Sequence, residues 1–342
     1  MNPPHFQLLM LPLARLRPST ALGAWWALSL ICAGFTVSLI SQELRLRWTP
    51  SRALWAFAFV VGSAATGTVI ATGQLTFLLV LPVTAAWIAT RRGDWNRAAY
   101  ILGLLASIKP FFGIFALYLL LTRQLGALAR MITSVAAIAL AGVAIVGLEP
   151  YGAWIRALSA VDWAWAPMNG AVLGVLARTL APNPFFRPLV VAQELITPLW
   201  ILGIIGVATS TFWVLLRDTA RQPDRTFAGL LLAAQLVSPL GWVYYLWFAA
   251  GPLVAVVRGG TFFANRSRMP TVLLCLSFIG LLCPHILTIA GGGWPWAGLT
   301  LGSTYSWTTL FLWGAWLSHC AGMHSSSQDL DALRPLLVVA DR

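Results

Sequence analysis

Charged side chains are scarce in this sequence. Of its 342 residues only 9% are charged, ten are acidic, and the single lysine is Lys109. Soluble domains carry about 25% charged residues, so the composition excludes an ordinary water-soluble domain. Apolar residues make up 59% of the chain. They form runs close to the roughly 20 residues that a helix needs to cross a bilayer core. Examples are residues 21–40, 53–71, 131–148, 198–216 and 271–290.

These runs predict an all-α polytopic membrane protein with about 9 to 11 transmembrane or half-membrane helices. One transmembrane domain is expected over residues 1–322, followed by a polar cytoplasmic tail over residues 323–342. No soluble module is expected. A membrane is therefore the first partner that the sequence implies.

Two further classes of protein are excluded by what is missing. The chain has four cysteines, which lie inside apolar runs without metal-ligand spacing, so neither a disulfide framework nor a metal cluster is implied. No cofactor is expected, although a divalent metal stays an open alternative. The net charge is +12, yet the 21 arginines are dispersed in short loops instead of gathered on one face. A nucleic-acid partner is therefore not expected.

The arginines instead indicate topology. Clusters at 45–52, 91–97, 123–130, 217–225 and 258–268 mark cytoplasmic loops under the positive-inside rule. Residues 53–71 and 75–90 then form an out-and-back pair with an external turn at Gly73-Gln74. A long external loop is expected over residues 149–193, and the C-terminus is expected in the cytoplasm. The expected location is the inner membrane of a bacterial cell, with the active face outside.

Two segments, 98–122 and 227–257, have arginine at both ends and a proline in the middle. Read as hairpins, they place 16 arginines inside and five outside; read as kinked single spans, they place 14 inside and seven outside. The count favours hairpins, while kinked spans stay open. In a hairpin, Lys109-Pro110 lies at the tip, near the outer surface.

The N-terminus does not follow this pattern simply. Tracing the topology backwards puts residues 1–20 outside, yet no signal peptide precedes them. An external start is most simply produced by an upstream span, so we expect the N-terminal part of the domain to be missing from this chain.

A few polar residues at membrane depth or in the external loop are functional candidates, because burying an ionisable group in a bilayer is costly. Lys109 is the foremost, since its ammonium beside a proline break suits a phosphate; the alternative is a lysine that snorkels to headgroups. The break at Ser238 to Trp242, near Tyr245, indicates a cavity wall or else a plain kink. Asp162 is the candidate external base, or a solvated loop aspartate.

Five segments follow one another along the chain: NPPHFQLLMLPLARLRPSTALGAWW, ATGQLTFLLVLPV, RRGDWNRAAYILGLLASIKPFFGIFALYLLLTR, MNGAVLGVLAR and QLVSPLGWVYYLWFAAGPL. Their order resembles glycosyltransferase family 87, bacterial membrane mannosyltransferases of C-type architecture that use polyprenyl-phosphate-mannose. The positions that match the family's usual elements are Pro3, Pro4, Gln74, Lys109, Pro110, Asn169, Ser238, Pro239 and Trp242.

The chain also departs from that family. Gly241 stands where a second serine is usual, Tyr244 and Tyr245 stand where histidines are usual, and Gly170-Ala171 replaces a glutamine-serine pair. The catalytic aspartate that C-type transferases place in their first external loop has no counterpart here, because this chain begins beyond that position.

The resemblance implies a glycosyltransferase that moves mannose from a polyprenyl-phosphate donor to a lipid or glycan acceptor on the extracytoplasmic side. The missing base is explained by a start further upstream, which we expect, by an inactive remnant, or by another acid that substitutes for it; Asp162 is the candidate for such a catalytic base. Phosphate binding is expected from Lys109, Arg15, Arg17 and Arg178, and substrate binding from Gln74, Asn169, Ser238, Trp242 and Tyr245. A lipid or solute transporter (or flippase), which also uses broken helices, and a non-catalytic remnant or assembly subunit are the alternatives.

Overall fold

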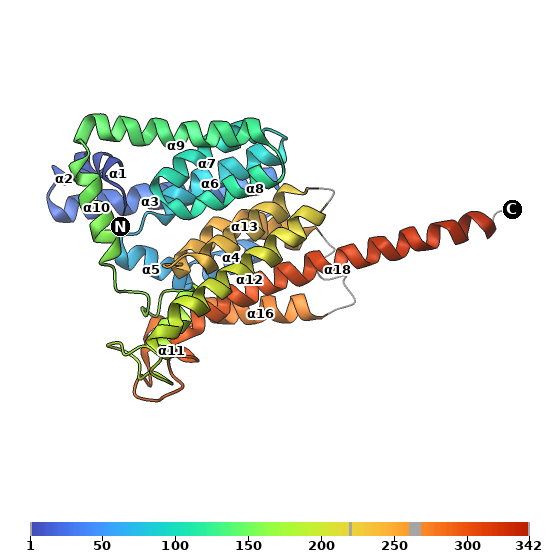
Figure 1. The fold of residues 1–342 in the computed structure, drawn as a ribbon. Coiled ribbons are helices and arrows are strands. Elements are labelled where there is room, and N and C mark those ends of the chain that lie inside the picture. The colour runs from blue at the N-terminus through green and yellow to red at the C-terminus, as the bar shows by residue number, and fades with distance from the viewer. Residues whose placement is uncertain (1, 219–220, 260–267, 341–342) are drawn as a thin grey trace.

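The computed structural model describes residues 2–218, 221–259 and 268–340, with side chains described up to residue 322. Within these ranges the chain forms α-helices and short 3-10 helices, and no strand apart from an isolated bridge between Asn169 and Trp242. Figure 1 shows the long helices side by side, with α10 (Glu149–Ser159) and α11 (Val172–Leu180) gathered at one end. The chain is an all-α polytopic membrane protein, as its apolar runs predict.

Among the described helices, three are long and apolar enough to cross a membrane. They are α3 (Pro18–Glu43), α9 (Leu125–Val146) and α12 (Ile196–Arg217), the last preceded by the short η2 (Gln193–Leu195). These match three of the predicted runs. Their outward-facing leucine, isoleucine and phenylalanine side chains are exposed, for example Phe35 at 61% and Leu140 at 69%, as expected for surfaces that face lipid.

The predicted out-and-back pair is present, but its first arm is bent. Helices α4 (Pro50–Gly62) and α5 (Ala64–Thr72) meet at 54°, because Ser63 is extended and its hydroxyl accepts a hydrogen bond from the Ala65 amide as the cap of α5. Gly73 then adopts a φ of 61° and ends α5, and α6 (Thr76–Arg91) returns. The prediction of a continuous helix over 53–71 is therefore wrong at Ser63.

The segment 98–122 is a hairpin. Helix α7 (Trp95–Ile108) ends at Lys109, whose backbone is extended before Pro110, and the chain turns through η1 (Pro110–Gly113) into α8 (Ile114–Leu121). The rings of Trp95 and Tyr118, at opposite ends of the segment, lie 5.7 Å apart. A kinked single span would separate these two residues by the thickness of the membrane, so the hairpin interpretation is confirmed.

The segment 227–257 is a second hairpin. Helix α13 (Pro223–Val237) leads to the Ser238–Trp242 turn, and the chain returns through η3 (Val243–Ala249) and α14 (Ala250–Arg258). The Trp87 indole donates to Asp224 Oδ1 at 2.9 Å, while the same ring lies against Gly251. Both arms therefore reach the same end of the bundle.

The run 271–290 is not one span. Helix α16 (Met269–Leu281) ends ahead of Pro284, and a short α17 (His285–Ile289) follows. The restriction that a proline places on the preceding residue explains this break, which the apolar composition alone did not reveal. The chain then passes through η4 (Leu301–Ser303) into α18 (Thr304–Ala340).

The two ends of the bundle differ in chemistry. We call the end that holds Gly73, Lys109 and Gly241 the tip end, and the opposite end the arginine end. At the arginine end, ion pairs join Glu43 to Arg91 and Arg92 at 3.4 and 2.9 Å and Asp224 to Arg91 at 3.5 Å. Helix α18 runs from the tip end to the arginine end, where the Trp316 indole donates to the Arg225 carbonyl at 3.1 Å.

At the tip end, the N-terminal residues form two short helices, α1 (Pro4–Leu8) and α2 (Leu11–Ala14). His5 contacts the Ser107 carbonyl through Nε2 and the Tyr151 hydroxyl through Nδ1, each at 3.0 Å. The N-terminal segment is thereby held against the end of α7, two residues before Lys109.

Candidate functional site

The two hairpin tips meet at Lys109 and Tyr245. The Lys109 ammonium lies 5.5 Å from the centroid of the Tyr245 ring, an ordinary cation–π distance. Both residues sit where a helix is interrupted: Lys109 directly before Pro110, and Tyr245 in η3 after the Ser238–Trp242 turn. The breaks that the sequence singled out separately thus form one location.

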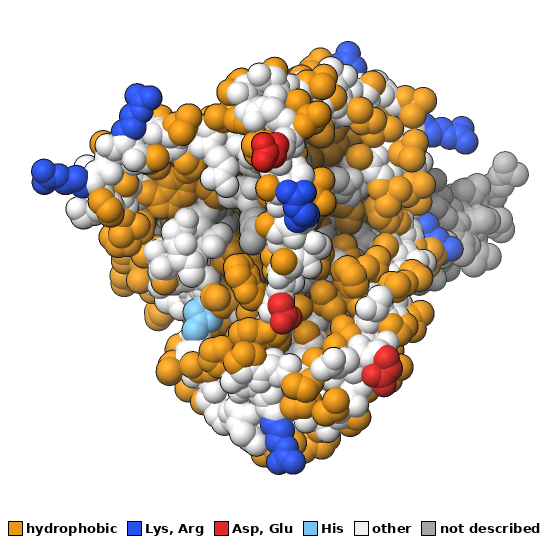
Figure 2. All heavy atoms as spheres, turned by 60° about the vertical axis from the view of Figure 1, so that its left-hand side comes forward, with side chains coloured by type: hydrophobic (Ala, Val, Ile, Leu, Met, Phe, Trp, Pro, Cys, Tyr) orange, Lys and Arg blue, Asp and Glu red, His pale blue; other side chains and the backbone are white. Residues whose placement is uncertain are grey.

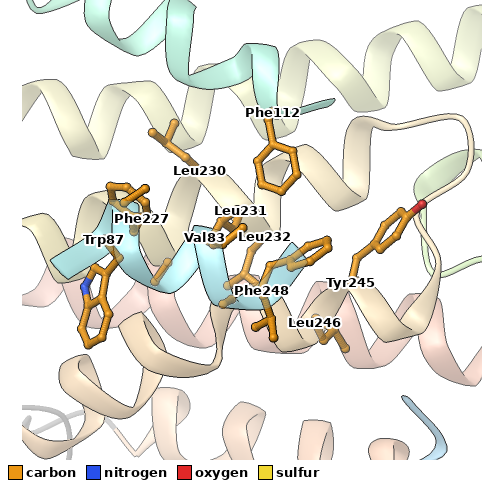
Figure 3. Packing of buried hydrophobic residues seen from close by; sticks show 14 of the residues in the cluster. Val83, Trp87, Phe112, Phe227, Leu230, Leu231, Leu232, Tyr245, Leu246 and Phe248 are labelled. Atoms are coloured by element: carbon orange, nitrogen blue, oxygen red, sulfur yellow. The ribbon is translucent and has the colours of Figure 1, made fainter. Parts of the chain in front are cut away.

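An aromatic layer supports this contact. The Phe111 ring lies 4.9 Å from Tyr245, and Phe248 lies 5.5 Å from Tyr245 and 5.4 Å from Phe112. Figure 3 shows Phe112, Phe248 and Tyr245 in one packed region with side chains of α6 and α13. Because both tips are anchored in a buried apolar layer, the position of the ammonium is fixed by packing.

Lys109 has no anionic partner among the described residues. Its side chain is half-buried, and neither a carboxylate nor a hydrogen-bond acceptor contacts its ammonium in the described part of the chain. A partly desolvated cation of this kind is an available binding group for an anion, and a phosphate is the anion that a lysine at an interrupted helix suits best.

Asn169 is placed differently from the expectation. It is 0% exposed; its amide nitrogen donates to the Ala164 and Pro239 carbonyls at 2.9 and 3.0 Å, and its side-chain oxygen accepts from the Ala171 and Gly241 amides at 3.1 and 3.0 Å. With these four bonds, the side chain ties the loop of residues 149–193 to the tip of the second hairpin. These bonds support a positioning role for Asn169, and its direct contact with substrate stays a prediction.

The backbone around Gly241 explains why a glycine stands there. The Gly170 amide donates to the Gly241 carbonyl at 2.7 Å and the Val243 amide to the Met168 carbonyl at 2.9 Å. A Cβ at position 241 would meet the Gln235 carbonyl oxygen, and a close approach of two backbones requires a residue without a side chain. Tight backbone packing therefore explains why position 241 holds a glycine and not the serine that is usual in the family that the sequence resembles.

Arg178 is also placed differently. It is fully buried, and all three guanidinium nitrogens donate to protein acceptors: Nε to Ser303 at 3.0 Å, Nη2 to Ser306 at 2.8 Å and Nη1 to the Ala166 carbonyl at 2.8 Å. Burial lowers its pKa to about 9, which still leaves it charged at neutral pH. Its donors hold the loop of residues 149–193 against η4 and α18, which supports a structural role, and phosphate binding by Arg178 stays a prediction.

The side chains of the remaining candidates, Gln74, Ser238 and Trp242, make no hydrogen bond with another described side chain. Gln74 is half-buried at the turn between α5 and α6, next to Gly73, whose carbonyl accepts from the Trp25 indole at 3.1 Å. Ser238 and Trp242 are half-buried in the second tip, where the Trp242 ring stacks on Tyr244 at 6.2 Å. These three side chains stay candidates for substrate contact.

Asp162, Arg15 and Arg17 are exposed, and none of their side chains makes a hydrogen bond or ion pair with a described residue. Figure 2, which turns the α10–α11 end toward the viewer, shows acidic side chains set apart from one another on a largely hydrophobic face. The structure thus leaves these three side chains free without bringing them to Lys109.

A comparison of the sequence with protein families decides the class. The model of glycosyltransferase family 87 matches residues 1–240, more than two thirds of the chain. The chain belongs to glycosyltransferase family 87.

One relative in this comparison is a polyprenol-phosphate-mannose-dependent alpha-(1-2)-phosphatidylinositol mannoside mannosyltransferase from Mycolicibacterium smegmatis (strain ATCC 700084 / mc(2)155). It is 28% identical over 248 residues, which cover 66% of this chain and 53% of the relative. The chain therefore spans about half the length of this relative. No solved structure matches the chain.

The match to family 87 covers the tip of the first hairpin and reaches the start of the second turn at residue 240. Lys109, Gln74 and Ser238 lie inside the matched range, whereas Tyr245 lies beyond it. Among the described side chains, no group of three histidine, cysteine, aspartate or glutamate residues is placed to hold a metal.

Sequence reasoning missed two residues that shape this family 87 site. His5 bonds the carbonyl of Ser107, and the buried Gln235 donates to the Trp242 carbonyl and the Thr309 hydroxyl, each at 3.2 Å. The role of Gln235 could have been predicted, because it is a polar residue inside the apolar run of α13 and a buried polar side chain needs a hydrogen-bond partner. His5 carries no comparable signal, because a histidine near a chain terminus is ordinary on a protein surface.

Proposed function

We propose that the chain is a membrane mannosyltransferase that transfers mannose from a polyprenyl-phosphate donor to a lipid or glycan acceptor on the extracytoplasmic side of a bacterial cell membrane. Membership of family 87 and the name of the mycobacterial relative support the class. The observation that carries it is the Lys109 ammonium at the meeting point of two hairpin tips, where it contacts the Tyr245 ring and no carboxylate among the described residues. The tip end is then extracytoplasmic, and the arginine end and the C-terminus are cytoplasmic.

The reaction is a single displacement at the anomeric carbon. The acceptor hydroxyl oxygen forms a bond to that carbon while the bond to the phosphate oxygen breaks, and its electron pair leaves with the polyprenyl phosphate. Lys109 stabilises the negative charge that develops on this leaving group. Stabilisation of developing charge by a fixed cation is usually the largest single contribution to lowering the barrier. A carboxylate accepts the hydroxyl proton; Asp162 in the external loop is the acid that we assign to this role. The configuration at the anomeric carbon inverts.

The donor's lipid tail needs an apolar surface that reaches the tip end. A cavity of about 140 Å³ lies between α3 and the α5–α6 turn, lined by Trp25, Ser29, Val69 and Phe77 among others. Phe77 also contacts Trp247 of η3, at 6.4 Å between ring centroids, so the cavity and the Lys109–Tyr245 contact share the short η3 helix. We assign the first isoprene units of the donor to this cavity.

Transfer in isolated membranes tests the proposal. Membranes that contain the full chain are incubated with polyprenyl-phosphate-mannose carrying a labelled sugar, and label in a new glycosidic product is measured. Lys109→Ala is expected to reduce the rate by about a hundredfold or more, because it removes a charge that stabilises the leaving group, whereas Lys109→Arg keeps part of the rate. Arg130→Ala, at the arginine end, is the control and is expected to keep the rate of the natural chain.

Two results contradict the proposal. If the folded natural chain forms no glycosidic product, the transferase assignment fails, and movement of intact donor between leaflets then identifies a transporter. If the Lys109→Ala variant keeps the full rate, the phosphate role of Lys109 fails. Asp162→Asn separately tests the base: an unchanged rate removes Asp162 from the reaction.

A further inference from the structure

A second cavity lies at the arginine end, far from the hairpin tips. It has a volume of about 740 Å³ and lies between the end of α3, the end of α6 and the start of α7. Its charged lining consists of Glu43, Arg45, Arg92, Asp94 and Arg97. None of these residues has a role in the transfer reaction, so the cavity calls for an explanation of its own.

The charges in this cavity are not balanced. Glu43 is already engaged by Arg91 and Arg92, at 3.4 and 2.9 Å. Asp94 accepts the Arg97 backbone amide at 2.9 Å and thereby caps α7. Within the described part of the chain, the guanidinium groups of Arg45 and Arg97 form no ion pair with either acid. The cavity therefore presents two cations whose charge is not neutralised.

Arg45 is held in place by an unusual backbone. Its φ is 48°, in the left-handed region that non-glycine residues seldom adopt. Its carbonyl accepts a hydrogen bond from Arg258 Nη2 at 3.4 Å, and Arg258 also donates to the carbonyl of Leu44. The end of α14 thus fixes the turn that brings Arg45 to the rim of the cavity.

Apart from Gln42, whose side-chain amide donates to the Ser38 hydroxyl at 3.0 Å, the rest of the lining is apolar. Leu39 of α3 and Ala85, Ile88 and Ala89 of α6 form the part of the cavity that lies within the bundle. Two of the three α6 residues are alanines, which leave a groove beside α3 instead of filling it. A charged rim above an apolar groove matches a molecule with an anionic head and an acyl chain.

We propose that this cavity binds the phosphate group of an anionic phospholipid, with Arg45 and Arg97 on the headgroup and an acyl chain along Leu39, Ala85 and Ala89. Basic pockets between transmembrane helices recognise anionic headgroups in this way, and each arginine near the surface adds appreciably to the attraction. The assignment of this lipid to the cytoplasmic leaflet rests on the sidedness proposed above. The binding site itself does not depend on the transferase activity.

The test measures retained lipid by native mass spectrometry of the purified full chain. The chain is exchanged into detergent with phosphatidylglycerol or with zwitterionic phosphatidylcholine of the same acyl chains. The natural chain is expected to retain phosphatidylglycerol in preference. The double variant Arg45→Ala/Arg97→Ala is expected to bind it at least about tenfold more weakly. Arg52→Ala, an exposed arginine of the same end that does not line the cavity, is the matched control and is expected to keep the affinity.

A further variant distinguishes a lipid from a soluble phosphate. Ala85→Phe fills the groove without changing a charge, so it is expected to weaken phosphatidylglycerol binding and to leave any competition by inorganic phosphate unchanged. Three results overturn the proposal: equal retention of both lipids, equal loss in the Arg52→Ala control, or full affinity in Ala85→Phe together with displacement of the lipid by inorganic phosphate. The last result identifies a site for a soluble phosphate compound.

Discussion

The Lys109 ammonium lies 5.5 Å from the centroid of the Tyr245 ring, and these two residues come from different hairpins, 136 positions apart in the sequence. Each hairpin contributes one element that an anion site at membrane depth needs. The first supplies the charge at a proline break, and the second supplies a ring whose face holds that charge without neutralising it. The ammonium stays available because its partner is a ring and not a carboxylate.

This relationship predicts a graded response at position 245. Tyr245→Phe keeps the ring and is expected to change transfer little, whereas Tyr245→Leu removes the ring face. A cation–π contact contributes about 0.5–2 kcal/mol, so the leucine variant should lose about 2- to 30-fold in kcat/KM. Kinetic measurement of mannose transfer checks this expectation. Equal losses in the phenylalanine and leucine variants would show that the Tyr245 hydroxyl, and not its ring, matters.

Gly241 gives a prediction about stability. A Cβ at this position would meet the Gln235 carbonyl oxygen and the Ala171 Cβ, at 3.1 Å for the latter. Overpacking of this kind costs about 1–3 kcal/mol, so Gly241→Ala is expected to lower the melting temperature in detergent. Gly67→Ala, in α5 with no atom within 4 Å of the added Cβ, is the matched control and is expected to leave the melting temperature unchanged or raised. Similar melting temperatures for the two variants would refute the close approach.

The sequence predicted the fold class and both hairpins because hydropathy and arginine placement respond to the same membrane. Lys109-Pro110 and Ser238-Pro239 could each be recognised as a helix break from local chemistry alone. The contact between these two breaks could not be predicted from the sequence, because it depends on how the two hairpins pack against each other. The bend at Ser63 and the break before Pro284 were likewise missed, since an apolar run looks the same whether its helix is straight, bent or ended early.

Polar residues show the same limit more sharply. Arg178 and Asn169 stood in an external loop beside apolar residues, where the sequence suggested binding. The structure instead buries both completely and saturates their hydrogen bonds. Burial of a polar side chain is decided by long-range packing, here by α18 and the second hairpin tip, so composition cannot separate a residue that binds a ligand from one that holds a loop.

The buried position of Arg178 predicts a loss of stability from a conservative change. A lysine cannot bridge Ser303, Ser306 and the Ala166 carbonyl, because its three donors sit on one nitrogen. Loss of charge-assisted hydrogen bonds of this type costs about 1.5–3 kcal/mol each, so Arg178→Lys is expected to lower the melting temperature.

The control for this change is Arg187→Lys, an exposed arginine of the same loop that should tolerate the substitution. Measured together, the melting temperature and the KM for the donor separate two roles. An unchanged melting temperature with a raised KM would return Arg178 to the phosphate site, against the structural role assigned here.

Asn169 predicts a coupling between the loop and the second hairpin. Asn169→Asp keeps the oxygen that accepts from Ala171 and Gly241 but removes the nitrogen that donates to Ala164 and Pro239. A carbonyl left without its partner costs up to about 1–3 kcal/mol, less where water can reach it as at Pro239, so this variant is expected to unfold at lower temperature and to make the loop accessible to a protease. Asn183→Asp, in the same loop, is the control. Unchanged protection of the loop would contradict the assigned role.

Sidedness is predicted from the hairpin geometry together with the arginine clusters. In a variant whose four cysteines, Cys32, Cys275, Cys283 and Cys320, are replaced by alanine, single cysteines are placed at positions 109, 123 and 162. An impermeant maleimide added to intact cells is expected to label positions 109 and 162, because the first hairpin tip and the external loop share the tip end. Position 123 lies at the other end of α8, so it is expected to react only after the cells are permeabilised. Labelling at 123 in intact cells, with none at 162, would reverse the orientation; the transfer site would then face the cytoplasm.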